Sequence, residues 1–550
     1  MILQTRSSIS LVVFVLLIGL TNGLAQSKSV IKLKGANSMK SLKVNDQLII
    51  RYIGDVVFEY ENTTITCDSA YMHKEENWFD AYRNVVVSQE SSKLYGDVLH
   101  FDGKTSIGEL TGKEVRLVDD DATLVTNILY FNSKTNYAYY TTGGVITTKD
   151  SKLTSQKGYY FRNEKKIAFA GNVVMNNTDG DIFTDSLEYN TNNKIASFFG
   201  PTNIYNKDNY AYCEKGWHNR DLNQSSLQKN AYIISDTYKM FGEDIFYDKQ
   251  NGFAKASKNI VVIDTVNRTY IYGDKGSYWE KTQEAEVTEN PYAMMIDKED
   301  TLFLRSDKLF LRTLKKDTVT NKDSTYKLLK ALGNVKFFRS DIQGKCDSMI
   351  YNSTDSTLKM YVEPVLWNQT NQMSANEIVI FSQQQSLRQV DFIGSAFMIS
   401  KETDLYFNQM QGKTIFARFL DGKLNKVDVK GNGQAVYFVK EKDTITMVNQ
   451  AECSNISIKI KNNSPSKITF LEKPISNFHP ISKIDIEEIN LKGFKWLESI
   501  RPSNKFSIIP ITLILFPEEK GKVSSTRKLE KTLIENKSIE LKDNEAMFVE

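Results

Sequence analysis

A short pattern of polar and apolar positions recurs along most of the chain. It consists of a small residue, a polar residue that we call the anchor, and apolar or aromatic residues two and four places later, as in "TDSLEYN" at residues 184–190. Residues two apart on a strand face the same side, so the pattern predicts a strand with one buried face. The first eight anchors are Asp68, Asp97, Asn127, Gln156, Asp185, Glu214, Glu243 and Asp274.

The anchors are almost evenly spaced. Successive anchors are 29, 30, 29, 29, 29, 29 and 31 residues apart. Looser copies follow at Asp307, Lys345, Asn376 and Lys413, and the polar insert Lys315–Thr325 lengthens one of the steps between them. A fixed period of this length is the signature of a repeat architecture.

Each repeat has a second half with its own plan. In "KKIAFAGNVVMNN" (Lys165–Asn177), a turn-prone polar cluster leads into aliphatic residues, then Gly-Asn, then a β-branched run. This composition is typical of strands separated by turns. One repeat therefore predicts two strands joined by a short antiparallel connection. Stretches with a helical period are nearly absent between Ile31 and Ile460, so we predict an all-β fold built of stacked hairpin-like units.

The apolar positions two and four places after the anchors define one face of these strands. They are Leu99, Phe101, Leu129, Phe131, Leu187, Tyr189, Ile245 and Tyr247. Stacked repeats align such side chains into a stripe. The pattern alone leaves two interpretations open, a plain hydrophobic core or the lining of a ligand groove.

The N-terminus predicts a secretory signal peptide. Arg6 precedes the apolar run Ile9–Leu20, and the small residues Gly23 and Ala25 follow, which predicts cleavage after Ala25. The run is shorter than the roughly 20 residues that a membrane span needs, so an uncleaved anchor is the weaker alternative. An exported chain of this kind is expected in the periplasm.

Charge and candidate chemistry argue against an enzyme and against nucleic acid as a partner. The formal net charge is +3, which gives no strongly basic field. The four His are scattered, and no catalytic motif, metal-ligand spacing or cofactor motif is present, so we expect no catalytic residue, no metal and no cofactor. One acid per repeat does not supply the 6–8 oxygens that calcium takes. We interpret the anchor acids as turn or strand-entry residues.

The four cysteines do not predict disulfides. Cys67 and Cys213 occupy the same slot five repeats apart, and repeats of two strands lie about 10 Å apart. That separation exceeds the Cα distance of about 7 Å that a disulfide tolerates. We therefore interpret these two residues, and also Cys346 and Cys453, as small buried side chains.

The chain is expected to divide into five segments. Residues 1–25 are the signal peptide, residues 26–220 a first β-repeat body, and residues 221–463 a second body or a continuation of the first. Residues 464–517, with three of the nine Pro before residue 484, form a C-terminal cap, and residues 518–550 form a charged, disordered tail.

One repeat resembles a known family. Gly54–Gln89 matches the OstA-like repeat of lipopolysaccharide-transport proteins at Gly54, Val56, Asp68, Ala70, Tyr71, Ala81, Asn84, Val85 and Val87. "AGNVVM" (Ala170–Met175) and "LGNVKF" (Leu332–Phe337) match its second half again. The family contains the periplasmic bridge protein LptA and the N-terminal domain of the outer-membrane protein LptD. The resemblance covers roughly residues 32–460, and it leaves too few residues after them for the barrel of LptD.

The resemblance implies a fold and a function. The fold is a repetitive, twisted, open antiparallel β-jellyroll with a groove for acyl chains, so the stripe residues become candidates for a lipid groove. The function is a non-enzymatic conduit that carries lipopolysaccharide to the outer membrane. The alternative is a structural or adhesive secreted β-solenoid without a lipid ligand, which has a dry, filled core.

The resemblance also implies partners. Jellyrolls of this family pair by their edge strands, and exposed edges invite strand addition. We expect the N-terminal edge at Val30–Gly35 and Gln47–Tyr52 to dock another jellyroll, with Ile49 and Ile50 as edge candidates. The C-terminal end, including "FSIIPITLILF" (Phe506–Phe516), is expected to fold back as a cap or to meet the outer-membrane assembly protein.

Overall fold

The computed structural model describes most of the chain between residues 30 and 510. The described residues are 30–44, 47–89, 91–119, 122–149, 151–177, 180–207, 209–296, 300–315, 325–383, 386–441, 444–461 and 464–510. The predicted signal peptide, the predicted disordered tail and nearly all of the polar insert lie outside them. No helix within these ranges is long and apolar enough to cross a membrane.

The chain forms two compact units, Met1–Thr142 (unit 1) and Gly143–Glu550 (unit 2). The strands of unit 1 are β1 (Lys32–Gly35), β2 (Ser38–Val44), β3 (Gln47–Tyr60), β4 (Thr63–His73), β5 (Trp78–Gln89), β6 (Ser92–Asp102), β7 (Ile107–Asp119), β8 (Ala122–Asn132) and β9 (Tyr137–Tyr140). The strands of unit 2 are β10 (Gly144–Thr148), β11 (Ser151–Ser155), β12 (Lys157–Phe161), β13 (Lys166–Asn177), β14 (Gly180–Asn190), β15 (Ile195–Tyr205), β16 (Asn209–Asn219), β17 (Gln224–Ser235), β18 (Tyr238–Asp248), β19 (Phe253–Asp264), β20 (Thr269–Trp279), β21 (Glu284–Thr288), β22 (Tyr292–Ile296), β23 (Thr301–Arg305), β24 (Lys308–Lys315), β25 (Thr325–Phe338), β26 (Gln343–Asn352), β27 (Thr357–Tyr361), β28 (Val365–Asn368), β29 (Asn371–Ser374), β30 (Glu377–Gln383), β31 (Ser386–Lys401), β32 (Phe407–Leu420), β33 (Lys423–Glu441), β34 (Thr444–Lys461), β35 (Ser464–Leu471) and β36 (Ile475–Pro480). Short helices follow at η1 (Ile481–Lys483), α1 (Ile486–Ile489), η2 (Glu498–Ile500) and η3 (Lys505–Ser507).

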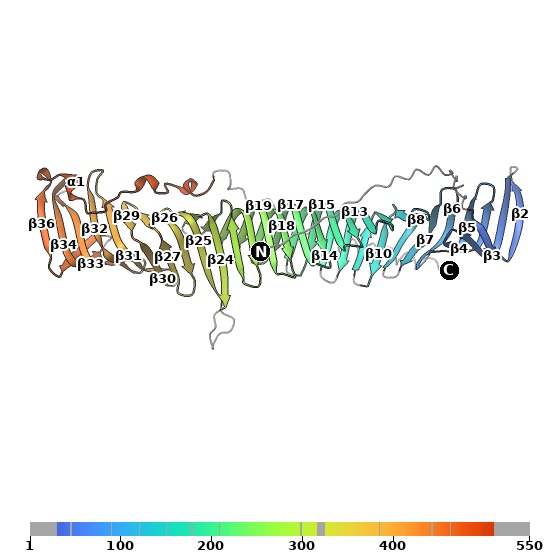
Figure 1. Cartoon of the computed structure of the whole chain (residues 1–550), viewed down its shortest axis with the longest axis horizontal. Helices are drawn as coiled ribbons and strands as arrows, with labels where there is room; N and C mark the ends of the chain where they lie inside the picture. The colour runs from blue at the N-terminus through green and yellow to red at the C-terminus, as the bar shows by residue number, and fades with distance from the viewer. Residues whose placement is uncertain are drawn as a thin grey trace, which may run out of the picture. The chain divides into compact units, whose positions relative to one another are not determined.

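Within each unit the strands pair antiparallel and mostly in chain order. In unit 1, β4 pairs with β3 and with β5. In unit 2, β13 to β20 pair in succession, and Figure 1 shows them side by side. The sequence-based prediction of a repetitive antiparallel β-jellyroll with two strands per repeat is confirmed. The helices of the described residues all come after Ile460, also as predicted.

Most of the long strands bend near the middle, where the register of the ladder shifts. In the pairing of β4 with β5, the shift lies between Thr66 and Ser69 and therefore contains the anchor Asp68. We call this position the corner. The interpretation of the anchor acids as turn or strand-entry residues is wrong for those that lie within strands, which are Asp68, Asp97, Asp185, Glu214, Glu243 and Asp274. It holds for Asp307, which directly precedes β24 (Lys308–Lys315).

The Gly-Asn and Arg-Asn pairs supply the backbone conformation of the corner. Asn84 has φ 46°, in the left-handed region that Asn tolerates better than most residues. Its side-chain amide donates to the Asp68 carboxylate at 3.1 and 3.2 Å, so the anchor of one strand fixes the corner of the next. Gly171 has φ +79°, and a Cβ there would lie 2.5 Å from Oε1 of the Gln156 anchor. Only Gly fits that corner without strain.

The corners divide the strands into two halves that form two facing walls. In unit 1, Val56–Tyr60 belongs to the first wall and Trp78–Tyr82 to the second. The rings of Phe58 and Phe79, one from each wall, lie with centroids 4.5 Å apart, and both side chains are fully buried. The bent sheet therefore encloses an apolar interior. We call the side of a wall that faces this interior its inner face.

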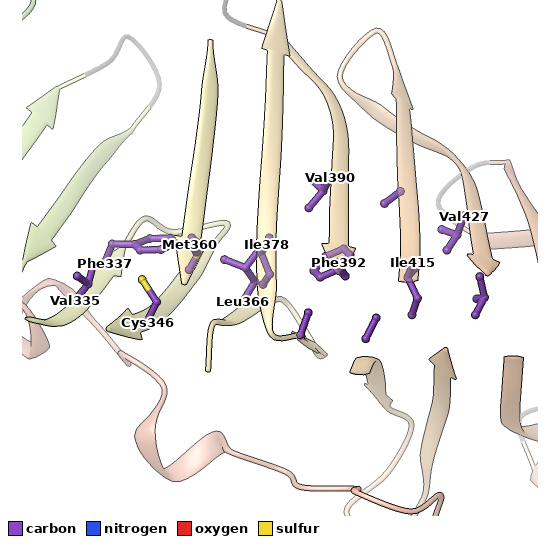
Figure 2. Close-up of a cluster of buried hydrophobic side chains, with 14 of the residues drawn as sticks. Val335, Phe337, Cys346, Met360, Leu366, Ile378, Val390, Phe392, Ile415 and Val427 are labelled. Carbon is purple, nitrogen blue, oxygen red and sulfur yellow. The ribbon is translucent and has the colours of Figure 1, made fainter. Parts of the chain in front are cut away.

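The interior of unit 2 is filled in the same way from both walls. Val335, Phe337 and Leu366 come from the first wall, and Met360 and Ile378 come from the second. Figure 2 shows the side chains of this cluster arranged one after another across the strands from β25 to β33. Successive side chains of a strand point to opposite faces, so every second side chain faces inward and fills the interior.

The chain turns back after β36 as a segment that we call the C-terminal strap (residues 481–510). Figure 1 shows it in red beside β26 and β29. Its buried residues Ile489, Ile508 and Ile509 belong to clusters that share no member with the interior cluster of Figure 2. The strap therefore lies on the outer face of the first wall. Before it, β35 and β36 each pair with β34.

The predicted boundary at residues 220 and 221 falls in the turn between β16 and β17. These two strands pair on both sides of their corner. The division into the segments 26–220, 221–463 and 464–517 stays a prediction.

Candidate functional site

Most of the stripe residues predicted from the sequence lie on the inner face. Leu99 and Phe101 are 0% exposed, and Leu129, Leu187 and Ile245 are at most 2% exposed. The fraction is 8% for Phe131, Tyr189 is half-buried, and Tyr247 is 36% exposed. The Tyr247 hydroxyl donates to Glu280 at 3.5 Å, at the end of its strand. The stripe is thus apolar and buried except at Tyr189 and Tyr247 of unit 2.

In unit 1 the register brings four of these residues together. Leu99 and Leu129 both pair with Leu110, and Phe101 and Phe131 both pair with Gly108. A Cβ on Gly108 would lie 2.3 Å from the Phe131 ring, so the absence of a side chain makes room for that ring. The other four candidates lie in unit 2, where Leu187 and Ile245 belong to separate clusters.

Both walls contribute aromatic residues that were not among the predicted site residues. Phe58, Tyr60 and Phe79 line the interior of unit 1 opposite or beside the stripe. Their rings form a chain of contacts, with centroid distances of 5.1 Å between Tyr60 and Phe101 and 5.8 Å between Phe79 and Phe101. The alternation Val56, Phe58, Tyr60 could have revealed this first-wall row, because it repeats the period of two.

Hydrogen bonds join the ends of the two walls in unit 1, along the line that we call the mouth. The Tyr60 hydroxyl donates to the Gly103 carbonyl at 3.1 Å and lies 2.8 Å from the Ser106 hydroxyl. One repeat before it, the Ile31 N–H donates to Asn77 at 3.2 Å. One repeat after it, Gln89 donates to Asn136 at 3.3 Å. The mouth of unit 1 is therefore closed by contacts that recur with the 29-residue period.

Lysines stand at the mouth on the turns of the second wall. Lys74, Lys104 and Lys134 occupy successive turns of unit 1, and all three are exposed. The same turns and the strand ends beside them also carry the acids Glu75, Glu76 and Asp102, and the first-wall tips carry Glu61 and Asp119. The mouth thus offers exposed lysines among acids beside an apolar interior.

Among the described residues, the titratable groups form no catalytic arrangement. Burial raises the pKa of Cys67 and Cys213 to about 11 and that of Cys346 to about 12, so these thiols stay protonated and weakly nucleophilic. All four cysteines are free and buried. Across the described part of the chain, no group of three or more His, Cys, Asp or Glu is placed to hold a metal.

Two histidines of unit 1, His73 and His100, lie on the outer face of the second wall, whereas His218 of unit 2 lies in the same cross-strand row as the stripe residues Tyr189 and Tyr247. The His100 side chain is 51% exposed and its Nδ1 lies 2.8 Å from Asp80. His73 stacks on Trp78 with centroids 3.5 Å apart, and His100 contacts the same indole. This grouping was not visible in the sequence, because the three residues come from three strands.

The N-terminal edge agrees with the prediction at Val30–Gly35, which contains β1, but not at Gln47–Tyr52. Ile49 pairs with Leu42 of β2 on one side and with His73 of β4 on the other, and Ile50 is likewise paired on both sides. The two edge candidates therefore lie one strand inside the edge. Among the described strands, β1 and β2 pair only with β3, so β1 and β2 form the edge.

Comparisons with known proteins agree with this architecture, a bent-strand β-jellyroll with an apolar interior. A family model described as OstA-like protein matches residues 28–182 and 168–243. A second, described as LptA/(LptD N-terminal domain) LPS transport protein, matches residues 270–386. The chain belongs to the OstA-like family of lipopolysaccharide-transport proteins.

Among solved structures, the chain is similar to LptH of Pseudomonas aeruginosa, the LptA homologous periplasmic component of the lipopolysaccharide transport device. The identity is 17%, the match covers 24% of this chain and 79% of that chain, and the TM-score is 0.15. A search of curated proteins found no match.

Proposed function

We propose that the protein is a non-enzymatic periplasmic conduit that binds the acyl chains of lipopolysaccharide between its walls and passes the lipid toward the outer membrane. The observation that supports this most is the inner face itself. Buried apolar side chains recur on it at the same position of several repeats, as Leu99, Leu129, Leu187 and Ile245 show, with Gly158 and Gly216 in the repeats between them. Family membership supports the choice of lipid.

Binding requires the walls to separate, because the rings of Phe58 and Phe79 from the two walls are in contact. The corners act as hinges, and the hydrogen bonds at the mouth break. Each such bond contributes about 1 kcal/mol net, and each methylene removed from water contributes about 0.8 kcal/mol. Two methylenes of an acyl chain therefore offset one bond at the mouth.

The lysines at the mouth are proposed to meet the lipid phosphates. An acyl chain between the walls places its polar head at the mouth, where Lys74, Lys104 and Lys134 stand. Charge-assisted hydrogen bonds from ammonium groups to phosphate are stronger than neutral ones. Replacing all three by Gln is expected to weaken lipid binding roughly tenfold at low salt and less at high salt, whereas Lys93→Gln on the strand β6 leaves it unchanged.

Photo-crosslinking tests where the lipid lies. A crosslinker at Phe131 or Tyr189 is expected to capture lipopolysaccharide, and one at the outward His100 or Glu188 is not. The double variant Leu129→Asp with Leu187→Asp is expected to abolish capture, because buried carboxylates replace apolar lining. Capture only from His100 and Glu188 would mean that the lipid does not enter the interior.

We propose further that the N-terminal edge, β1 and β2, pairs with another jellyroll of the transport bridge, and that the C-terminal end meets the outer-membrane assembly protein. Among the described strands, β1 and β2 of unit 1 and β35 and β36 of unit 2 pair on one side only, which supports this assignment.

The second candidate, a structural β-solenoid without lipid, is favoured by the contact between the walls. It predicts that the interior stays closed. Mass spectrometry of lipid that co-purifies with the periplasmic protein separates the two, since stoichiometric lipopolysaccharide contradicts the solenoid and its absence contradicts the conduit.

A further inference from the structure

The outer face of the first wall in unit 2 carries a row of buried glutamines beneath the C-terminal strap. Cross-strand pairing aligns one residue from each first-wall strand from β26 to β34. The row is Gln343, Trp367, Gln372, Ile399, Gln409, Val436 and Gln450. Gln343, Gln372 and Gln409 are each at most 3% exposed, although they face away from the interior.

These glutamines bind the strap along its length. Gln372 donates to the Lys495 carbonyl and accepts from the Leu497 N–H, both at 2.7 Å. Gln409 accepts from the Leu491 N–H at 2.9 Å, and its amide donates to Asn490 at 2.6 Å. A buried carboxamide that pairs with a passing backbone holds an irregular segment in the way that a neighbouring strand would hold a strand.

The third buried glutamine, Gln343, contacts the strap at Arg501. Gln343 accepts from Nε and Nη2 of Arg501 at 2.9 and 2.6 Å. Arg501 also donates to the Gln369 carbonyl at 2.9 Å.

The same outer face becomes aromatic before β26, where a second cross-strand row runs from β16 to β22. It consists of Tyr212, Tyr232, Phe241, Val261, Tyr272 and Tyr292. The ring centroids lie 5.1 Å apart for Tyr212 and Tyr232 and 4.5 Å apart for Tyr272 and Tyr292. Ile508 and Ile509 of the strap belong to the same buried cluster, so the strap arrives on this aromatic row.

The aromatic row is wider than the part of the strap that the structure describes. Six strands at about 4.8 Å span about 24 Å between the first and the last, and two isoleucines cover only part of that width. The Tyr292 hydroxyl is buried and has no hydrogen-bond partner among the described residues. A buried hydroxyl without a partner costs about 1–3 kcal/mol, which a further main-chain carbonyl on this face would remove.

The sequence that follows the strap fits the remaining width. Residues 511–516 read "ITLILF", the most apolar stretch after the N-terminal signal, and Pro517 ends it. Six extended residues reach about 20 Å, or four strand spacings. The charged sequence after Pro517 has no such apolar run.

We propose that residues 511–516 dock on the outer aromatic row of β16–β22 and so extend the C-terminal strap over the first wall. The strap then runs from β34 to β16, held by glutamines where its sequence is polar and by aromatic rings where its sequence is apolar. The charged tail begins beside β16 rather than at the C-terminal end of the stacked strands. This inference does not depend on lipid binding, because it concerns the opposite face of the wall.

A photo-crosslinking residue at Leu513 of the full chain tests the docking. The expected result is a crosslink within one chain to peptides that contain Tyr232 or Phe241. The same residue placed at Leu529 in the charged tail is the matched control and is expected to give no such product. Products from Leu513 that join two chains, or that contain only lipid, would overturn the proposal.

Truncation gives an independent readout. A chain that ends at Pro510 keeps the glutamine contacts but loses the apolar run, and amide exchange in β17–β19 is expected to be about tenfold faster. A chain that ends at Glu519 keeps the run and is expected to exchange like the full chain. Equal exchange in both truncated chains would overturn the proposal, and circular dichroism checks that both remain folded.

Discussion

Unit 1 and the β25–β34 part of unit 2 use the same bent strand but stabilise it differently. In unit 1 the rings of Phe58, Phe79, Phe101 and Phe131 contact one another in series, and the mouth is closed by its own hydrogen bonds. In the β25–β34 part, the interior is mostly Val, Ile, Ala and Met, and a strap covers the outer face.

The comparison shows that the corner determines the bent-strand architecture, whereas the side chains that fill the interior can be aromatic or aliphatic. Large rings reach across the interior and hold the walls by themselves. Smaller aliphatic side chains bury less area each, and burial contributes about 25 cal/mol per Å². A wall with an aliphatic inner face therefore gains from a second layer on its outer face, which the strap supplies.

The largest expected effect is in the aromatic interior. Phe79→Ala removes a fully buried ring that contacts Phe58 and Phe101, and it is expected to lower the unfolding free energy of unit 1 by about 3–5 kcal/mol. Ile378→Val in the aliphatic interior is the comparison and is expected to cost about 0.5–1.5 kcal/mol. Denaturant unfolding measures both. A loss below about 1.5 kcal/mol for Phe79→Ala would mean that the rings do not hold the walls.

The next effect concerns the strap. Gln372→Ala leaves the Lys495 carbonyl and the Leu497 N–H without their partner and is expected to cost about 1–3 kcal/mol. Hydrogen exchange of the strap backbone near these two residues is expected to speed up. The exposed Gln383→Ala on β30 is the control, with a change within about 0.5 kcal/mol. Unchanged exchange in the Gln372 variant would show that the strap is held by other contacts.

A smaller effect is expected at the mouth of unit 1. Tyr60→Phe keeps the ring against Phe101 but removes the hydroxyl that bonds to Gly103 and Ser106. The expected cost is about 1 kcal/mol, measured by thermal unfolding. Tyr95→Phe on the outer face controls for the loss of a hydroxyl, and an equal shift in both variants would remove the case for a closed mouth.

The smallest effect is expected at the N-terminal edge. A Pro at Ser41 or at Leu42 of β2 removes one backbone donor, and at adjacent positions one donor faces β3 and the other faces the free side. The variant whose Pro lies on the free side keeps its pairing with β3, so its circular dichroism spectrum is expected to stay unchanged. This variant is expected to bind a partner jellyroll about fivefold more weakly, the equivalent of about 1 kcal/mol. A titration in which neither variant loses affinity would exclude edge pairing through β2.

The sequence by itself determined the strands, their two-per-repeat grouping and the inward residues. The 29-residue spacing and the period of two are local properties, so Leu99, Leu129 and Leu187 could be assigned to one face without a structure. The same pattern did not separate Tyr247, which is 36% exposed, from Phe101, which has the same place in its repeat and is 0% exposed, because burial depends on contacts with other strands, such as that of Phe101 with Tyr60.

Only the tertiary structure decided the corners, the edge and the strap. The corner at Asn84 needs the carboxylate of Asp68 from the neighbouring strand, so its conformation is not encoded locally. Ile49 lies one strand inside the edge of the sheet because β2 pairs with β3. In the sequence Gln372 is an ordinary polar strand residue. In the structure its amide donates to the carbonyl of Lys495, 123 positions later in the chain. Side chains acquire such roles from contacts between distant segments, and a local pattern of polar and apolar residues does not encode those contacts.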